Sequence, residues 1–495
     1  MAFERVRTAL GAAVAAYRSY QMPETPETLN QRYAQRWAYY DGTAFNAAWK
    51  RKGVFRDQRV YRQTRLVYKH IAGMGNFYAA TVYQGNLPTD GLRLPDGSRG
   101  AIPIDPQTGD KANDAAVLTA TAEHWNRWNW QQGMTLRPLN ASVLGDSMTE
   151  LIDDTARHAV SPALIWPGHV VDITLDAVGN VKAHTLEYLI TREERGQEVT
   201  FRFRKEVDGQ AFRYYRDDRP WSDPDGHGEW EQENPYGFDP AIWDRHKVVW
   251  DAETGTLSVR GLPAMEDTRQ ALNELNSMLS HAMDYQTKQF AAPIFVRGGA
   301  NSAQLPDADR ERLNIYEVGA DGGADIIQFD VGKTLEMLQW VKDGILEENP
   351  EASFYHDLRE MSSLTGPAVE RALGDAVSRV NLARAGYDAN SVKLFQMAIA
   401  IAGYRLNNGD WKEPTKRDRV FAPFDLGSYK AGQLDMTILG RPVVPQTEED
   451  RLDLIERKER LQFKDSLIAL GYTETDADRI ITEREATALR RADFL

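Results

Sequence analysis

The amino-acid sequence predicts an α+β protein in which helices flank an antiparallel sheet. Short alternating β-like runs fill residues 161–259 and are separated by Asp-Gly and Asp-Pro-Asp-Gly turns. Long apolar stripes at helical spacing follow from residue 264 onward, and shorter helical stretches precede the sheet. With 495 residues, of which 42% are hydrophobic, the chain is long enough to bury several cores.

Composition excludes several classes of function. The formal net charge of -14 argues against a broad basic surface for nucleic acid, so any DNA contact would be local or transient. The absence of cysteine excludes disulfides, thiolate metal sites and thiol catalysis. Residues 1–20 have the pattern of an amphipathic helix rather than a signal peptide, and no apolar window is long enough to span a bilayer. We therefore expect a soluble protein without a membrane contact.

The N-terminal half begins with helices and continues as a sheet. Helical periodicity covers "RYAQRWAYYDG" and residues 62–85, where Leu66, Ile71 and Tyr78 suit a packed face. A loop rich in Pro, Gly and Asp follows from Gly85 to Asp114, and "AAVLTATAEHWNRWNW" predicts the next helix. Residues 161–259 are then predicted to form one meandering antiparallel sheet.

The C-terminal half is predicted to contain three long helices. The first spans about 25 residues from Pro263, because its apolar residues recur at helical spacing. An insert from Ala291 to Asp330 contains the strand-like runs "PIFVRG", "IYEVG" and "ADIIQFD" and a short helix "DADRERLN". The second helix begins near Lys333 and ends at Asn349-Pro350. The third runs from about residue 376 to 407, before a β-like "RDRVFAPFDL" and two or three further helices.

A nucleotide-binding loop is suggested by Gly332-Lys333-Thr334 and then excluded. Such a loop needs a glycine five residues earlier so that backbone N–H groups can surround the phosphates, and that position is Ile327. We interpret the glycine as part of a turn from strand into helix.

Three other motifs resemble catalytic or metal-binding sites, but each lacks the residues or the spacing that such a site requires. "LGDSM" contains the Gly-Asp-Ser of a lipase family, but no histidine follows an aspartate at the required offset. The carboxylates of Asp223 to Glu229 do not have the spacing of a calcium loop and fit a solvated turn. His281 and Asp284 on one helix face fit a polar stripe better than an acid–base pair. Many tryptophans and carboxylates leave a carbohydrate-active hydrolase as the alternative from another class.

The order of elements resembles the portal proteins of tailed bacteriophages. Similar stretches are "SVLGDSMTELIDD" with "PGHVVDITLDAVGNV", "NPYGFDPAIWDRHKVV", and above all "EDTRQALNELNSMLSHAMDYQTKQFAAPIFVRGG", which looks like a stem helix entering a clip domain. "SSLTGPAVERALGDAVSRVNLARAGY" is similar to the family's tunnel loop and the long helix after it. The resemblance covers roughly residues 30 to 480.

The resemblance implies the portal-protein fold, with wing, stem, clip and crown regions. Mapped by position, the expected divisions are a wing at 1–263, a first stem helix at 264–290, a clip at 291–331, a second stem helix with the following helix at 332–361, a tunnel loop at 362–376, a long helix and wing return at 377–450, and a helical crown at 451–495.

The resemblance also implies three groups of site residues. The expected channel or tunnel-loop residues are Thr365, Gly366, Val369, Glu370 and Arg371. The expected channel face of the stem carries Glu274, His281, Asp284 and Lys288, and the clip residues expected to contact partners are Asp307, Asp309, Arg310 and Arg312. The first stem helix is net acidic, and an acidic tunnel would repel phosphates and favour sliding over binding.

What the resemblance implies about function is structural rather than enzymatic. It implies a homo-oligomeric ring of about twelve subunits at one capsid vertex of the virion, assembled in the host cytoplasm, with double-stranded DNA passing through it. The expected partners are the terminase, a head-completion adaptor, and the major capsid and scaffold proteins. Catalytic residues, cofactors and metals are expected to be absent. A different head or connector component is the alternative within structural proteins.

Overall fold

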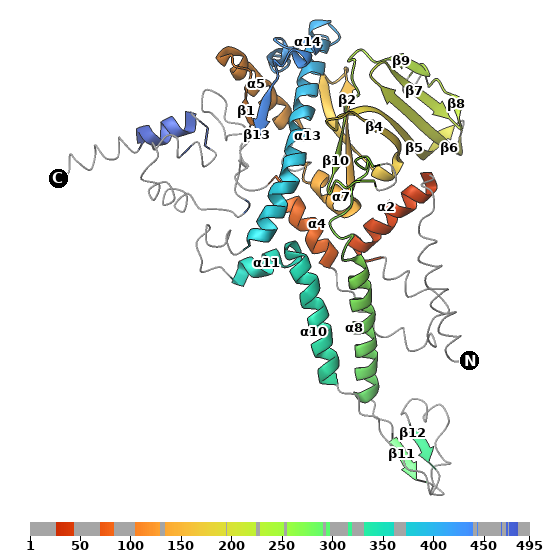
Figure 1. Cartoon of the computed structure of the whole chain (residues 1–495). Coiled ribbons are helices and arrows are strands. Elements are labelled where there is room, and N and C mark those ends of the chain that lie inside the picture. Colours follow the sequence, from red (N-terminus) through yellow and green to blue (C-terminus); the bar gives the residue numbers. More distant parts are fainter. Residues whose placement is uncertain are drawn as a thin grey trace, which may run out of the picture.

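The computed structural model confirms an α+β protein. It describes residues 26–43, 70–83, 104–128, 134–194, 196–223, 228–251, 255–290, 294–297, 315–318, 331–360, 373–438, 443, 467, 472–473 and 475–483. The body contains most of the strands and helices, and a pair of helices projects from it (Figure 1).

The helices of the first half lie before the main strands, and those of the second half follow them. The first group is α2 (Pro26–Asp41), α4 (His70–Thr81), α5 (Lys111–Trp128) and α7 (Leu136–Leu144). The second group is α8 (Arg269–Phe290), α10 (Val331–Glu348), α11 (Pro350–Glu360), α13 (Gly374–Asn407) and α14 (Leu426–Lys430). Two short 3-10 helices are η1 (Pro167–His169) and η3 (Asp418–Phe421). Residues 475–483 are also helical.

The described strands form four separate sheets. A three-stranded antiparallel sheet has the order β10 (Ala241–Arg245), β2 (Asp146–Asp154), β3 (Ala159–Ile165). A six-stranded sheet contains β4 (Val170–Leu175), β5 (Val181–Glu194), β6 (Gln197–Asp208), β7 (Ala211–Arg216), β8 (Arg219–Pro220) and β9 (Glu231–Glu233). Two-stranded pairs join β1 (Ile104–Pro106) to β13 (Met436–Ile438), and β11 (Ile294–Arg297) to β12 (Ile315–Val318).

The prediction of one meandering sheet was therefore wrong. Strands β4 to β7 do form a meander, but β2 and β3 pair with β10 in a second sheet. The register places Trp243 of β10 opposite Met148 of β2. Both side chains join the cluster that also contains Val170 and Leu186 of the six-stranded sheet. Burial between two layers explains the division, because β2 is enclosed along residues 146–151.

Other predicted boundaries are corrected by the structure. The segment "RDRVFAPFDL" is not β-like: it forms η3 and then a turn, because Asp418 accepts hydrogen bonds from Thr415 and Asp425 caps α14. The loop expected to extend to Asp114 ends earlier, at the start of α5, and contains β1. The first stem helix begins at Arg269 rather than at residue 264, after a series of turns. Residues 374–376, expected in the tunnel loop, already belong to α13.

Helix α13 is the centre of the main core. Its segment from Leu394 to Ala402 is buried almost without interruption, because α5, β10, β13 and η3 pack around it (Figure 1). Gly403 continues this close packing: a Cβ there would lie 2.1 Å from the carbonyl oxygen of Phe424. The apolar run in α13 is thus buried in the core of the body.

A buried ion pair joins three elements of this core. Arg137 of α7 donates from Nε and Nη2 to the two carboxylate oxygens of Asp244 in β10, each at 2.9 Å. Both side chains are almost completely buried. From α13, Ser391 accepts from Arg137 at 2.9 Å and Asn390 donates to Asp244 at 2.8 Å. The ion pair is bidentate, and both side chains make further hydrogen bonds to α13. A buried charge is tolerated in such an arrangement.

Replacing Arg137 by methionine should strongly destabilise the body. The Arg137→Met variant leaves the Asp244 carboxylate buried without its guanidinium, and breaking such a pair costs about 3–5 kcal/mol. Urea denaturation followed by tryptophan fluorescence measures the change. The matched control is Arg157→Ala, whose guanidinium is 85% exposed beside Asp154 and should change stability by less than about 1 kcal/mol. Equal losses in the two variants would contradict the assigned role.

A buried histidine should make the body sensitive to acid. His124 of α5 is 1% exposed and lies against Trp128 and Phe421, with ring centroids 4.8 and 4.5 Å away. Burial, and secondly the nearby Arg127, lowers the pKa of His124 to about 3. Below the ordinary histidine pKa the unfolded chain therefore binds a proton that the folded chain does not.

We expect the His124→Phe variant to lose the part of this acid sensitivity that comes from His124, while the part from other buried histidines such as His246 stays. Between pH 6.5 and 3 the free energy of unfolding of the native chain should fall with decreasing pH. At pH 4 the protonation of His124 in the unfolded chain should lower this free energy by roughly 3 kcal/mol. Urea titrations of both proteins at pH 7 and pH 4 measure the difference. Parallel pH profiles of the two proteins would show that His124 does not cause the acid sensitivity.

Candidate functional site

Two antiparallel helices form the most distinctive feature of the chain. Helix α8 leaves the body and α10 returns to it, with β11 and β12 at the far end (Figure 1). Their seam contains Leu272 and Leu275 of α8 and Leu338 and Ile345 of α10, all at most 4% exposed. These positions recur at helical spacing on each helix, so the sequence pattern predicted most of the seam. Leu335, which the same pattern assigns to the apolar stripe of α10, is instead 52% exposed.

The end of α8 next to the body is held by α2. Arg36 donates to the carbonyl oxygen of Leu144 at 2.5 Å and forms a salt bridge with Glu266, just before α8, at 3.4 Å. Asn273 of α8 donates to the hydroxyl of Tyr39 at 2.9 Å. The direction in which α8 leaves the body is therefore set by polar contacts with an N-terminal helix.

The returning end is fixed by a buried carboxylate. Glu351, in the first turn of α11, is 1% exposed and forms a salt bridge with Arg379 of α13 at 3.0 Å. The hydroxyl of Tyr78 in α4 donates to the same carboxylate at 3.2 Å, and burial together with Glu351 raises the pKa of Tyr78. Arg379 also donates to the carbonyl oxygen of Glu348, the last residue of α10. Glu351 thus joins the start of α11 to α4 and α13, and Arg379 joins α13 to the end of α10.

A cavity of about 570 Å³ lies where the pair joins the body. It is lined by Tyr78, His246, Lys247, Asp267, Thr268, Glu348, Asn349, Arg379, Leu382 and Ala383. Burial, with a smaller effect of Lys247, lowers the pKa of His246 to about 3, so this imidazole is neutral near pH 7. Leu382 projects from α13 at the cavity and is 80% exposed.

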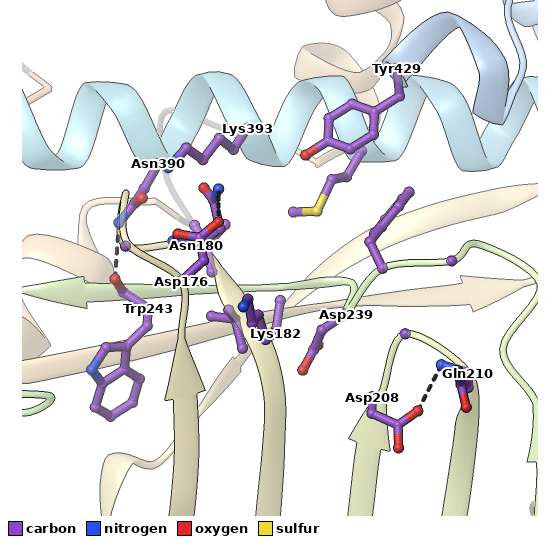
Figure 2. A pocket seen from close by; sticks show the side chains of 18 residues that line it. Asp176, Asn180, Lys182, Asp208, Gln210, Asp239, Trp243, Asn390, Lys393 and Tyr429 are labelled. Atoms are coloured by element: carbon purple, nitrogen blue, oxygen red, sulfur yellow. Dashed lines mark hydrogen bonds between the residues drawn. The ribbon is translucent and has the colours of Figure 1, made fainter. Parts of the chain in front are cut away.

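Figure 2 shows a second cavity, of about 680 Å³, between α13 and the turns of the six-stranded sheet. Asp176 accepts from Asn180 in the turn between β4 and β5, and these hydrogen bonds outweigh burial and lower its pKa. Asp239 lies 2.6 Å from Nδ1 of His184, and burial, opposed by His184, raises the pKa of its carboxyl. Lys393 of α13 completes the lining, and burial lowers its pKa.

This second cavity has mixed charge and no arrangement that identifies a reaction. Its carboxylates are held by a turn or by a histidine, and no cluster of three or more potential metal ligands occurs among the described residues. The described helices also include none that is long and apolar enough to cross a membrane.

The structure reinterprets the Gly-Asp-Ser motif as part of the fold. Gly145 ends α7 with a φ of 99°, a conformation that favours glycine. Asp146 accepts from the hydroxyl of Tyr33 at 2.5 Å and from the backbone of Gly261 at 2.7 Å, and burial, opposed by these bonds, raises its pKa to about 6. The side chain of Ser147 is fully buried in β2, where a substrate does not reach it.

The structure describes part of the carboxylate-rich segment from Asp223 to Glu229 and the backbone of Gly332-Lys333-Thr334. Asp223 pairs with Gly228 in an antiparallel bridge, as expected of a turn, and accepts from Arg192 at 2.6 Å. Residues 224–227 lie outside the described residues. Gly332, Lys333 and Thr334 occupy the first turn of α10, which begins at Val331.

Only one group of predicted site residues can be located. Glu274 is exposed on α8, and the helix backbone also carries positions 281, 284 and 288 on the side away from the seam. The side chains of His281, Asp284 and Lys288 lie outside the described residues. The same holds for Thr365, Gly366, Val369, Glu370 and Arg371 of the expected tunnel loop, and for Asp307, Asp309, Arg310 and Arg312 of the expected clip.

Sequence reasoning missed the residues that fix the helix pair. Glu351 and Arg379 are separated by a long stretch of chain, and nothing in the local pattern of either indicates that they meet. The proline after Asn349 was the available signal, because it correctly predicted where α10 ends and α11 begins.

Comparison with known proteins does not place the chain in a family. No family model and no curated protein matches the sequence. The functional inference therefore rests on the order of the elements and on the contacts described above.

Shortening a seam residue should loosen the helix pair without unfolding the body. We expect Leu338→Ala to cost about 2–5 kcal/mol, because Leu338 is 4% exposed against α8. The matched control is Leu335→Ala on the same helix, where the side chain is 52% exposed and the cost should be below about 0.5 kcal/mol. Hydrogen exchange under dilute conditions should show faster exchange in α8 and α10 only for Leu338→Ala. Unchanged exchange in that variant would contradict the seam.

Proposed function

We propose that the chain is a portal protein of a tailed bacteriophage, a subunit of the ring through which double-stranded DNA enters and leaves the capsid. The observation that carries the proposal is the course of the chain (Figure 1). It leaves an α+β body along α8, passes through the small parallel pair β11 and β12, and returns along α10. In the proposed ring the body is the wing, the helix pair is the stem, and the strand pair belongs to the clip.

The attachment of the helix pair supports a mechanical role. Polar contacts of Arg36 and Glu351 fix the two body-proximal ends, so that a force applied at the far end reaches the body through both helices. A two-helix hairpin has only one apolar seam, and hairpins of this kind gain stability when neighbours pack on their outer faces. A ring of copies would supply such neighbours.

The charge of the stem agrees with a channel for DNA. Glu274 is exposed, and the positions of His281, Asp284 and Lys288 share the side of α8 away from the seam. In the proposal this side lines the channel, where carboxylates repel phosphates and keep the duplex free to slide. The chain itself performs no catalysis in this proposal, and ATP is hydrolysed by a separate motor.

The proposed partners follow from the two ends of the molecule. The terminase binds the clip before the capsid is filled, and a head-completion adaptor binds the same end afterwards. The major capsid and scaffold proteins surround the wing. The virion is the proposed location after assembly in the host cytoplasm.

The alternative from another class is a carbohydrate-active hydrolase. The cavity in Figure 2 favours it most, because Asp176 and Asp208 lie on neighbouring turns at its rim. A hydrolase of this kind predicts a monomer in which two carboxylates flank a bound sugar. The portal proposal predicts an oligomer without such an activity.

The purified full-length chain should assemble into closed rings. Native mass spectrometry measures the number of subunits, expected to be about twelve, and negative-stain microscopy should show a central hole. The Arg157→Ala variant, whose stability should change little, should form the same rings as the native chain. A chain that stays monomeric at every concentration, with or without scaffold protein, would contradict the proposal.

A further inference from the structure

A short basic segment follows the end of α13 that points away from the helix pair (Figure 1). Residues 410–419, "DWKEPTKRDR", contain four lysines and arginines and three carboxylates, in a chain whose formal net charge is -14. The side chains of Lys412, Lys416, Arg417 and Arg419 are all exposed. A run of basic residues as dense as this one is typical of a surface that contacts a polyanion.

Two of the three carboxylates in this basic segment are bound by arginines of the body. Asp410 accepts from Arg405 of α13 at 2.9 Å. Asp418 is 2% exposed and accepts from Arg127 of α5 at 2.7 Å. Burial raises the pKa of Asp418, but hydrogen bonds, first that from Arg127, outweigh burial and lower the pKa to about 2. The third carboxylate, Glu413, is exposed.

The cations of the basic segment, in contrast, are left at the surface. Arg417 is 64% exposed and pairs with Glu123 of α5 at 2.8 Å. Among the described residues, Lys412, Lys416 and Arg419 form no salt bridge. The fold therefore directs most of the segment's negative charge toward the body and its positive charge toward solvent.

Buried groups fix the backbone of the basic segment. Trp411 is 2% exposed and stacks on His158, with ring centroids 5.5 Å apart. The carboxylate of Asp418 also accepts from the backbone N–H and the hydroxyl of Thr415, at 2.7 and 2.8 Å. The exposed cations thus extend from an ordered turn, which loses little conformational freedom when it binds a partner.

We propose that the basic segment contacts the phosphate backbone of double-stranded DNA. The inference rests on the proposed function: in a portal whose clip faces the motor, the opposite end of the body faces the capsid interior, where the packaged duplex lies. Cations that bind phosphates release the counterions of the duplex, so a few of them give a weak contact that depends on salt. Phosphate contacts carry no sequence information, so this contact accepts any base sequence.

Charge reversal tests the contact with fluorescence anisotropy of a labelled duplex at about 50 mM salt. The test variant reverses the three unpaired cations: Lys412→Glu, Lys416→Glu and Arg419→Glu. The matched control reverses three exposed cations on α5, β5 and β8: Lys111→Glu, Lys182→Glu and Arg219→Glu. Both variants have the same formal net charge. We expect the test variant to bind at least about tenfold more weakly than the native chain, and the control to stay within about threefold of it.

The salt dependence of binding gives an independent measurement. Glutamine in place of Lys412, Lys416 and Arg419 removes the contacts without adding repulsion. The slope of log affinity against log salt concentration should then become shallower by about 3. Two unrelated duplexes of equal length should bind the native chain equally, and a preference above about tenfold would indicate base contacts and overturn the inference. Circular dichroism establishes that each variant is folded.

Photo-cross-linking locates the DNA directly, because the native chain contains no cysteine. Asn408→Cys places a thiol at an exposed position next to the basic segment and leaves its cations in place. A phenyl azide attached to this thiol should cross-link a labelled duplex on illumination. Leu189→Cys is the control, since Leu189 is 72% exposed in β5 and should give little product.

The outcomes separate this inference from the proposed function. Rings that bind no duplex, or whose binding falls equally in the test variant and its control, would overturn the inference and leave the portal proposal standing. Equal cross-linking from the two cysteines would also overturn it. Binding that depends on the basic segment, in a chain that never forms rings, would support the contact and count against a portal.

Discussion

The buried pair of Arg137 and Asp244 is the interaction on which the body depends. It joins α7, β10 and α13, which come from widely separated parts of the sequence. A charge removed from water has a high cost unless its partner and further hydrogen bonds are in place, so these elements must meet in one relative position. Ser391 and Asn390 of α13 satisfy this requirement together, and the long helix is thereby fixed against both layers.

Charged contacts also hold the projecting helices against the body. Arg36 holds the start of α8, and Glu351 with Arg379 holds the end of α10. Between these points the helices depend on a narrow apolar seam. The helix pair is therefore firmly attached at its base and weakly supported along its length, which explains why contacts with further copies are important to its proposed role.

Buried charged groups such as Arg137 and Glu351 are held by partners of opposite charge, whereas several large apolar side chains lie on the surface. Trp250 is 71% exposed and Trp340 is 77% exposed, on separate elements. Apolar side chains are common on protein surfaces when they are scattered, so this exposure by itself identifies no partner. The cavity beside Asp239 has mixed charge and does not identify a ligand.

The sequence by itself determined the fold class, the three long helices and two short strands between the first and second of them, because alternation, helical periodicity and proline positions are local signals. It did not reveal that β2 leaves the meander to pair with β10, nor that Arg137 reaches Asp244. Those features depend on contacts between residues that are far apart in the sequence, and local patterns do not indicate such contacts. Likewise Gly145-Asp146-Ser147 resembles a catalytic motif in sequence. Only the tertiary structure shows that Gly145 ends α7 and that Asp146 and Ser147 are buried in β2.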